Sequence, residues 1–316
     1  MPVIRRSNRA GRPTVVVLGD LVLDVVLAPS RPLELSSDVP GRVALVQGGS
    51  AATTARWVGR LGARSSLIAA VGRDATGRAL VRAIRADGVT AHVSRVAGAR
   101  TGRIGVLVGP DGERSFVQDR GAAELLSPAE LRADWFTGAD VLHLPIYSLL
   151  GGPLGGAGRR AIELGRAARA LVSIDLASIA PLMAGGRRAA RALIREIAPD
   201  LVFATTIEAE ALLGGGPLVG LLGFAPIAVV KRGSLGATVL ARDGADTLRF
   251  EAATEALTAI DTTGAGDAFD AGFLVGWVSA RAAGRSSSAS LHRAALVAHR
   301  AAARQLSTPR AELAIG

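Results

Sequence analysis

Short apolar runs rich in β-branched residues alternate along this chain with longer segments of helical periodicity. The runs that we expect to form buried strands are Val15–Leu18, Ser66–Val71, Val141–Leu144, Leu171–Asp175, Leu201–Ala204 and Ile227–Lys231. The segments that we expect to form helices are Ser50–Leu61, Thr76–Ala86, Arg159–Ala170, Arg187–Ile197, Ile207–Leu213 and a last one near Ser288–Arg304. This alternation favours an α/β fold that is doubly wound, with a mostly parallel sheet and helices on both faces.

Two regions interrupt this alternation, because residues 33–47 and 90–119 show no helical period. The second region holds two extended stretches, Gly102–Val108 and Arg114–Gln118, joined by the hairpin turn signal Pro110-Asp111-Gly112. We expect a small β-sheet lid made of segments at about 31–47 and 90–120, inserted into one domain that spans 14–316. An extra hairpin at one edge of the main sheet is the alternative interpretation.

The composition is that of a globular protein, with 316 residues of which 49% are hydrophobic and 20% charged. Because the chain has no cysteine, disulfides and thiolate chemistry are excluded. No segment has the roughly 18 uninterrupted apolar residues of a membrane span, so we expect a soluble, cytoplasmic protein with no membrane partner. Residues 1–13 carry four arginines and are expected to form a disordered basic leader.

The formal net charge of +10 raises the question of a nucleic-acid partner. The arginines are scattered through every segment, and aromatic residues make up only 3% of the chain, so stacking platforms for bases are scarce. We therefore expect no nucleic-acid partner. The positive charge is consistent with anionic substrates such as nucleotides.

The strongest chemical signal is the stretch Asp261–Leu274, with the sequence DTTGAGDAFDAGFL. It reads as a tight turn that leads into the N-terminus of a helix. There the backbone N–H groups of Gly264, Ala265 and Gly266 can converge on an anion, helped by the helix dipole. A carboxylate beside such a site repels an anion, so mere binding does not favour Asp267. A general base for phosphoryl transfer requires that placement.

Further polar and glycine-rich segments follow the expected strands. Asp24 lies within an apolar run, and contact with a substrate or capping of a local turn explains it equally well. The pair Gly48-Gly49 opens a helix and would let a ligand approach the backbone. Glu208 begins a helix, where the dipole alone would favour it. Lys231–Gly236 is a glycine-bracketed turn suited to a hairpin or to nucleotide contact. The sequence has no P-loop motif and no zinc-ligand spacing of its histidines.

In order and spacing, these pieces resemble the ribokinase-like, or PfkB-type, carbohydrate kinase family. The resemblance runs from Gly19 to the closing segment 307–312 and covers nearly the whole chain. It is most specific over Asp261–Leu274, which matches the C-terminal signature of the family throughout. The glycine pair at 48 and 49, with Gly62 and Gly72 at family spacing, resembles the N-terminal signature.

The resemblance implies a kinase that uses ATP and Mg²⁺ to phosphorylate a hydroxyl, a primary one, of a sugar or sugar-like substrate. For the chemistry, the resemblance implies Asp267 as the base and Gly264, Ala265 and Gly266 as the anion hole. For the ligands, it implies substrate contacts by Asp24, Gly48, Gly49 and Thr53, and nucleotide contacts by Thr205, Lys231, Gly233, Gly236 and His292. For the ions, it implies Glu208 as a water-mediated Mg²⁺ ligand, and Asp261 and Thr263 at a monovalent cation (K⁺) site.

The chain also departs from the family pattern. Thr53 and Thr205 stand where the family commonly has asparagine, and Ser50 stands where a ribokinase usually has lysine. Ala303-Arg304 replaces a usual Gly-Ala pair, which bears on the monovalent cation site. Threonine lacks the paired donor and acceptor of an amide, so we expect a substrate pocket unlike that of ribokinase.

Two alternatives to a sugar kinase follow from these departures. A nucleoside kinase of the same fold would keep the phosphate site and differ in the substrate pocket. A catalytically weak or inactive kinase-like protein would serve as a ligand sensor. For the assembly, an exposed lid sheet would allow a homodimer formed through the lid.

Overall fold

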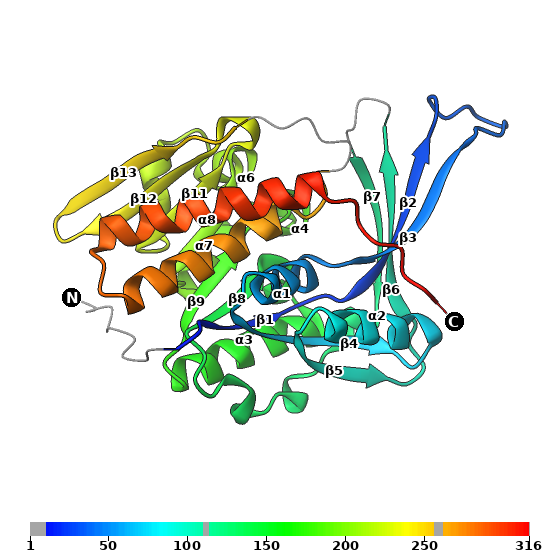
Figure 1. Ribbon diagram of the computed structural model, residues 1–316, viewed down its shortest axis with the longest axis horizontal. Coiled ribbons are helices and arrows are strands. Elements are labelled where there is room, and N and C mark those ends of the chain that lie inside the picture. The colour runs from blue at the N-terminus through cyan, green and yellow to red at the C-terminus, as the bar shows by residue number, and fades with distance from the viewer. Residues whose placement is uncertain (1–10, 110–113, 256–261, 316) are drawn as a thin grey trace.

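The computed structural model describes residues 11–109, 114–255 and 262–315 (Figure 1). The predicted turn at Pro110-Asp111-Gly112, the cation ligand Asp261 and the first ten residues of the predicted leader lie outside the described residues.

The described residues form a nine-stranded sheet with the order β13-β12-β11-β10-β9-β8-β1-β4-β5. Its strands are β1 (Thr14–Leu18), β4 (Arg64–Gly72), β5 (Thr90–Val96), β8 (Val141–Pro145), β9 (Leu171–Asp175), β10 (Leu201–Thr205), β11 (Ile227–Lys231), β12 (Ala237–Asp243) and β13 (Asp246–Ala252). Neighbours from β11 to β5 are parallel, whereas β12 and β13 form an antiparallel edge. The chain runs from β1 outward to β4 and β5 and then returns to β8, so the strand order reverses at β1.

Helices cover both faces of this sheet, as Figure 1 shows. They are α1 (Ser50–Arg60), α2 (Ala75–Ala86), α3 (Gly152–Ala167), α4 (Ile179–Met183), α5 (Gly186–Ile197), α6 (Thr206–Leu213), α7 (Ala265–Ala282) and α8 (Ser287–Ser307). Short 3-10 helices occupy Ala122–Leu125, Pro128–Glu130, Ala133–Phe136, Ile146–Leu149, Leu218–Gly223 and Gly233–Leu235.

Two hydrophobic cores follow from the alternation of side chains along the strands. Val15 and Val17 of β1 belong to the core under α1, α2, α7 and α8. Val16 and Leu18 belong to the opposite core, under α3, α5 and α6. Burial on both faces explains why these strands are continuously apolar. The predicted doubly wound fold is confirmed.

The second sheet has four strands in the order β3-β2-β6-β7 and stands away from the large sheet (Figure 1). Its strands are β2 (Val22–Pro29), β3 (Gly41–Gly48), β6 (Thr101–Val108) and β7 (Arg114–Gly121). We call this sheet the lid.

The bounds of the lid differ from the expected segments at both ends. β2 belongs to the lid, although its residues continue the apolar run of β1. The two strands are separate because β1 ends just before Gly19, where the chain leaves the large sheet. A Cβ at Gly19 would lie 2.7 Å from Cβ of Ala51, so α1 packs directly against this point. The first part of segment 90–120 instead forms β5, because Ala91 and Val93 pack against the core of the large domain.

The last described residues return to the lid. Glu312 forms an antiparallel bridge with Val46 of β3, and the amide of Leu313 donates to the carbonyl of Leu45 at 2.7 Å. Arg42 of β3 pairs with Glu312 at 3.0 Å. The C-terminal tail is thereby held between the lid and the large domain. Among the helices of the described residues, none combines the length and the apolar character needed to span a bilayer.

Candidate active site

A cavity of about 860 Å³ lies between the lid and the carboxyl ends of the central strands. Tyr147, Asp175, Thr205 and Lys231, which end or follow β8, β9, β10 and β11, line its floor, and Asp20 follows β1. This is the place where doubly wound sheets bind ligands, beside the point of reversed strand order. The lid, the first turn of α7, one side of α1 and the C-terminal tail supply the other walls.

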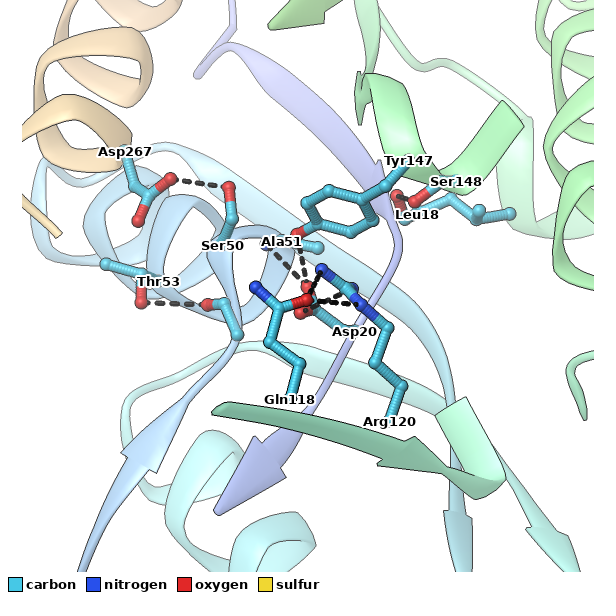
Figure 2. A network of polar contacts seen from close by, with 11 residues as sticks. Leu18, Asp20, Ser50, Ala51, Thr53, Gln118, Arg120, Tyr147, Ser148 and Asp267 are labelled. Carbon is cyan, nitrogen blue, oxygen red and sulfur yellow. Dashed lines mark hydrogen bonds and ion pairs between the residues drawn. The ribbon is translucent and has the colours of Figure 1, made fainter. Parts of the chain in front are cut away.

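Asp267 lies in the first turn of α7 and lines this cavity. The hydroxyl of Ser50, at the N-terminus of α1, donates to Oδ1 of Asp267 at 2.5 Å (Figure 2). Removal from water raises the pKa of Asp267 from 3.8 to about 7, the Ser50 hydrogen bond opposes the rise, and the nearby carboxylate of Asp175 adds to it. Asp267 is therefore a part-buried carboxyl group that exchanges a proton near neutral pH.

The three residues predicted as an anion hole lie together at the start of this helix. Gly264 caps α7 with a φ of 78°, a left-handed conformation that favours glycine. Ala265 and Gly266 follow in the helix, and all three line the cavity. The amide of Ala265 donates to the carbonyl of Thr262 at 3.2 Å within the turn. The ammonium group of Lys231 lies 3.5 Å from the point where a Cβ of residue 266 would stand, which adds positive charge beneath the turn.

Side chains from three other elements hold the turn that precedes α7. From the lid, Arg114 donates to the hydroxyls of Thr262 and of Thr263, the latter at 2.6 Å. From α8, the amide of Gln305 donates to the carbonyl of Thr263 at 2.9 Å, and Trp57 of α1 donates to Gln305 at 2.9 Å. No local sequence pattern indicates these contacts, because the residues that make them are far apart in the chain.

The predicted substrate contacts lie where the lid meets the start of α1. Asp24 on β2 is buried, and Arg310 of the C-terminal tail pairs with it at 2.7 Å. Gly48 is required beside it, because a Cβ there would lie 1.8 Å from Oδ1 of Asp24. Gly49 has a φ of 100° and caps α1, and the hydroxyl of Thr53 donates to its carbonyl at 2.9 Å.

A second polar network surrounds Asp20, whose partners the sequence does not indicate (Figure 2). The hydroxyl of Tyr147 donates to Oδ1 of Asp20 at 2.6 Å, and Arg120 pairs with Oδ2 at 3.3 Å. The Arg120 guanidinium lies 3.9 Å from the centre of the Tyr147 ring and donates to Gln118. Burial raises the pKa of Tyr147 well above its ordinary value, and the charge of Asp20 raises it further. Tyr147 therefore stays a neutral hydrogen-bond donor, and the network ties the lid strand β7 to the large domain.

A lysine between two carboxylates forms the floor under the α7 turn. Nζ of Lys231 lies 3.1 Å from Oδ2 of Asp175 and 3.1 Å from Oδ2 of Asp270. Burial alone would lower the pKa of Lys231, but the attraction of the two carboxylates outweighs it and raises that pKa. Lys231 is thus a fixed cation. It was predicted as a nucleotide contact, whereas Asp175 and Asp270 had not been singled out.

Thr205 and Glu208 form a reciprocal cap at the start of α6. The amide of Thr205 donates to Oε2 of Glu208 at 2.8 Å, and the amide of Glu208 donates to the Thr205 hydroxyl at 3.3 Å. Burial raises the pKa of Glu208, and the charge of Asp175 raises it further. Threonine can therefore serve at a position where the family commonly has asparagine, because both side chains cap a helix.

The other predicted nucleotide contacts are more dispersed. Gly233 lines the main cavity. Gly236 has a φ of 84°, and a Cβ there would lie 2.1 Å from the carbonyl oxygen of Ala252, so it permits a close approach of two strands. His292 is outside the main cavity; it stacks on Phe250 at 3.8 Å and lines a second cavity of about 750 Å³.

Comparison with known proteins places this site in a family. The model of the pfkB family of carbohydrate kinases matches residues 12–313. The chain belongs to this family. It is a carbohydrate kinase, a phosphotransferase with an alcohol group as acceptor.

Relatives of this PfkB-family kinase include fructokinase-1 of Oryza sativa subsp. japonica, which is 33% identical over 82% of each chain. The adenosine kinase of Sinorhizobium meliloti is 26% identical, with a TM-score of 0.81 over 95% of this chain and 96% of its own. A fructokinase of Vibrio cholerae O395, solved with fructose, ADP and calcium, has a TM-score of 0.77 over 94% of each chain at 22% identity.

Proposed function

We propose that this kinase transfers the γ-phosphoryl group of ATP to a primary hydroxyl of a sugar or sugar-like substrate. The observation that carries the proposal is the part-buried Asp267, which lines the cavity beside the N-terminus of α7 with a pKa of about 7. A base with such a pKa is about half ionised at pH 7, and its ionised form accepts a proton readily. The fructokinase relatives support a sugar as the acceptor.

In the proposed reaction, ionised Asp267 accepts the proton of the acceptor hydroxyl. The hydroxyl oxygen forms a bond to the γ-phosphorus while the bond to the bridging oxygen breaks, and that electron pair leaves with ADP. The first-turn amides of α7 and the helix dipole stabilise the charge on the transferring group. Lys231, held by Asp175 and Asp270, adds a fixed positive charge below the same turn.

For the nucleotide, we propose a path along the carboxyl ends of β10 and β11. Thr205 and Gly233 line the main cavity there, and Gly236 shapes the turn after β11. The second cavity, with His292 on its wall, would hold the base. Lys231 would act on the phosphates through its charge.

The residues present fit a Mg²⁺ ion. Glu208 is buried against the cavity, and Oδ1 of Asp175 is buried with no hydrogen-bond partner among the described residues. Mg²⁺ in kinases takes one or two carboxylates together with waters and phosphate oxygens. We propose that Glu208, through water, and Asp175 hold this ion, which when bound would neutralise charge on the phosphates.

A monovalent cation fits less well. In the described part of the turn, the carbonyl of Thr263 accepts from Gln305 and its hydroxyl accepts from Arg114. A cation would have to displace these donors from Thr263. We therefore propose no K⁺ site, in contrast to what the family resemblance implied.

We propose a homodimer formed through the lid. The side chain of Val117 on β7 is 78% exposed, and Val43 on β3 is 64% exposed. Phe116 and Gln118 line the cavity, so alternation along β7 directs Val117 to the outer face. An outward apolar face favours pairing with a second copy. A monomer by light scattering at micromolar concentration would contradict this.

A nucleoside kinase is the second candidate, favoured by the fold match with an adenosine kinase over 95% of this chain. A screen of sugars and nucleosides with ATP, read by ADP release, separates the candidates. Turnover of a sugar with no turnover of nucleosides supports the first proposal, and the reverse result supports the second. Ligand binding without ADP release would replace both with a sensor.

A further inference from the structure

We propose that the acceptor substrate carries an anionic group, a carboxylate or a phosphate ester, which Arg310 and Arg56 bind at the end of the cavity remote from Asp267. The inference rests on the proposed function and specifies the substrate class of the same site.

Arg310 places a positive charge in the cavity wall beside Asp24, a predicted substrate contact. Its side chain is 13% exposed, lines the cavity, and donates to Oδ2 of Asp24 at 2.7 Å. The tail that carries it is fixed on β3 by the bridge between Glu312 and Val46. A planar guanidinium has donors in a fixed fork that match a carboxylate or a phosphate, so Arg310 can bind an anion while it remains paired with Asp24.

Two further arginines on α1 line the same cavity. Arg56 lies 2.5 Å from Oδ2 of Asp87, and Arg60 lies 3.4 Å from Oδ1 of the same carboxylate. Burial lowers the pKa of Arg56. The negative charge of Asp87 opposes this decrease, whereas the positive charges of Arg60 and Arg310 add to it. Three guanidinium groups therefore line one wall of the cavity. They would attract an anionic group of a ligand.

The side chain of Gln47 is a second, independent sign of a ligand. It is 6% exposed and lines the cavity, yet neither Nε2 nor Oε1 has a hydrogen-bond partner among the described residues. A buried amide without partners is costly, so a ligand that supplies them is favoured. Gln47 lies one residue before Gly48, at the end of β3 that borders Asp24.

The spacing along α1 fits a small sugar with its reactive hydroxyl and its anion at opposite ends. Ser50 contacts Asp267 at the start of the helix, and Arg56 follows six residues later. At a rise of about 1.5 Å per residue, the two positions are about 9 Å apart along the axis. That length matches a phosphorylated or carboxylated sugar of five or six carbons.

The experiment measures kcat/KM for ADP release with three matched probes: fructose, fructose 6-phosphate and 2-ketogluconate. We expect at least one anionic probe to exceed fructose by about 100-fold, the size of a buried charge contact. A preference for the phosphate or for the carboxylate identifies the source of the charge. Fructose as good as both anionic probes would overturn the inference and leave the proposed function intact.

Variants test the residues that bind the charge. Arg310→Met and Arg56→Met should each raise KM for the preferred anionic probe by about 10-fold or more, with KM for fructose nearly unchanged, and Arg310→Lys should recover part of the loss. Arg42→Met removes an exposed arginine that pairs with the same tail and serves as the control. Equal losses on neutral and anionic probes would refute the inference.

If no sugar or nucleoside is turned over, the proposed function fails. Calorimetric binding of the same three probes to the wild type and to Arg310→Met then decides the inference by itself. Tighter binding of an anionic probe that the variant loses supports it, and equal affinities reject it.

Discussion

Replacing Ser50 by alanine should shift the pH dependence of this kinase toward higher pH. The Ser50 hydroxyl donates to Asp267 at 2.5 Å, and this bond lowers the pKa of a carboxyl that removal from water raises to about 7. Hydrogen bonds to charged groups contribute about 1.5–3 kcal/mol. Since about 1.4 kcal/mol corresponds to one pH unit, loss of the bond should move this pKa upward by about one to two units.

The size of the effect on rate follows from the ionised fraction of the base. In the wild type, about half of Asp267 is ionised at pH 7, and kcat/KM should fall about tenfold for each pH unit below 6. With a pKa near 8 to 9, about 1–10% is ionised at pH 7, so Ser50→Ala should lose about 5- to 50-fold there. The two proteins should converge near pH 10, where both bases are ionised.

The assay is coupled ADP release at saturating ATP, with kcat/KM for the acceptor measured from pH 5 to 10. Thr53→Val is the matched control, because the Thr53 hydroxyl lies on the same helix but donates to Gly49 instead of the base. Its acidic limb should coincide with that of the wild type. Superimposed limbs for Ser50→Ala and the wild type would refute the reasoning, as would full activity in Asp267→Asn.

The same group links activity to stability. A carboxyl whose pKa is raised on folding binds its proton more tightly in the folded state. Below pH 3.8 the carboxyl is neutral in both the folded and the unfolded state, so it does not lower the free energy of unfolding. This stability is lost as the pH rises through about 7, because ionising the carboxyl is less favourable in the folded state. The difference between 3.8 and 7 corresponds to at most about 4 kcal/mol. Asp267→Asn should therefore be more stable than the wild type at pH 8, by denaturant unfolding, and equal to it at pH 4.

Three further predictions concern other parts of the site. Lys231→Met should lower the free energy of unfolding by about 3–5 kcal/mol at pH 7, because it leaves Asp270 buried without its cation. Denaturant titration measures this change, and a loss below about 1 kcal/mol would contradict a stabilising role of the buried pair. Gly48→Ala should raise KM for the acceptor at least about tenfold with KM for ATP unchanged, because the new Cβ would displace Asp24. The control is Gly105→Ala in the lid, where a new Cβ would make only ordinary contacts, and it should leave both KM values unchanged. Replacing K⁺ by tetramethylammonium should leave kcat within about twofold, since protein donors already bind the turn before the anion hole; strong activation by K⁺ would show that a cation displaces them.

Local pattern was sufficient for the strands β1, β4, β8, β9, β10 and β11 of the large sheet, but not for β5, β12 and β13. The apolar runs from Val15 to Leu18 and from Ile227 to Lys231 became β1 and β11 because both faces of these strands are buried. The lid was harder to delimit. Its strand β2 continues the apolar run of β1, and only the packing of α1 against Gly19 separates the two.

The sequence by itself determined the geometry of the proposed phosphate site, because a turn, a helix N-terminus and an acid in the first turn are consecutive residues. Gly264 and Asp267 needed no distant partner to be recognised. The tertiary structure alone decided the partners that tune them. Ser50 meets Asp267 across 217 residues, and Arg310 meets Asp24 across 286. Contacts at such separations depend on how helices, lid and tail pack, and no local pattern in the chain encodes that packing.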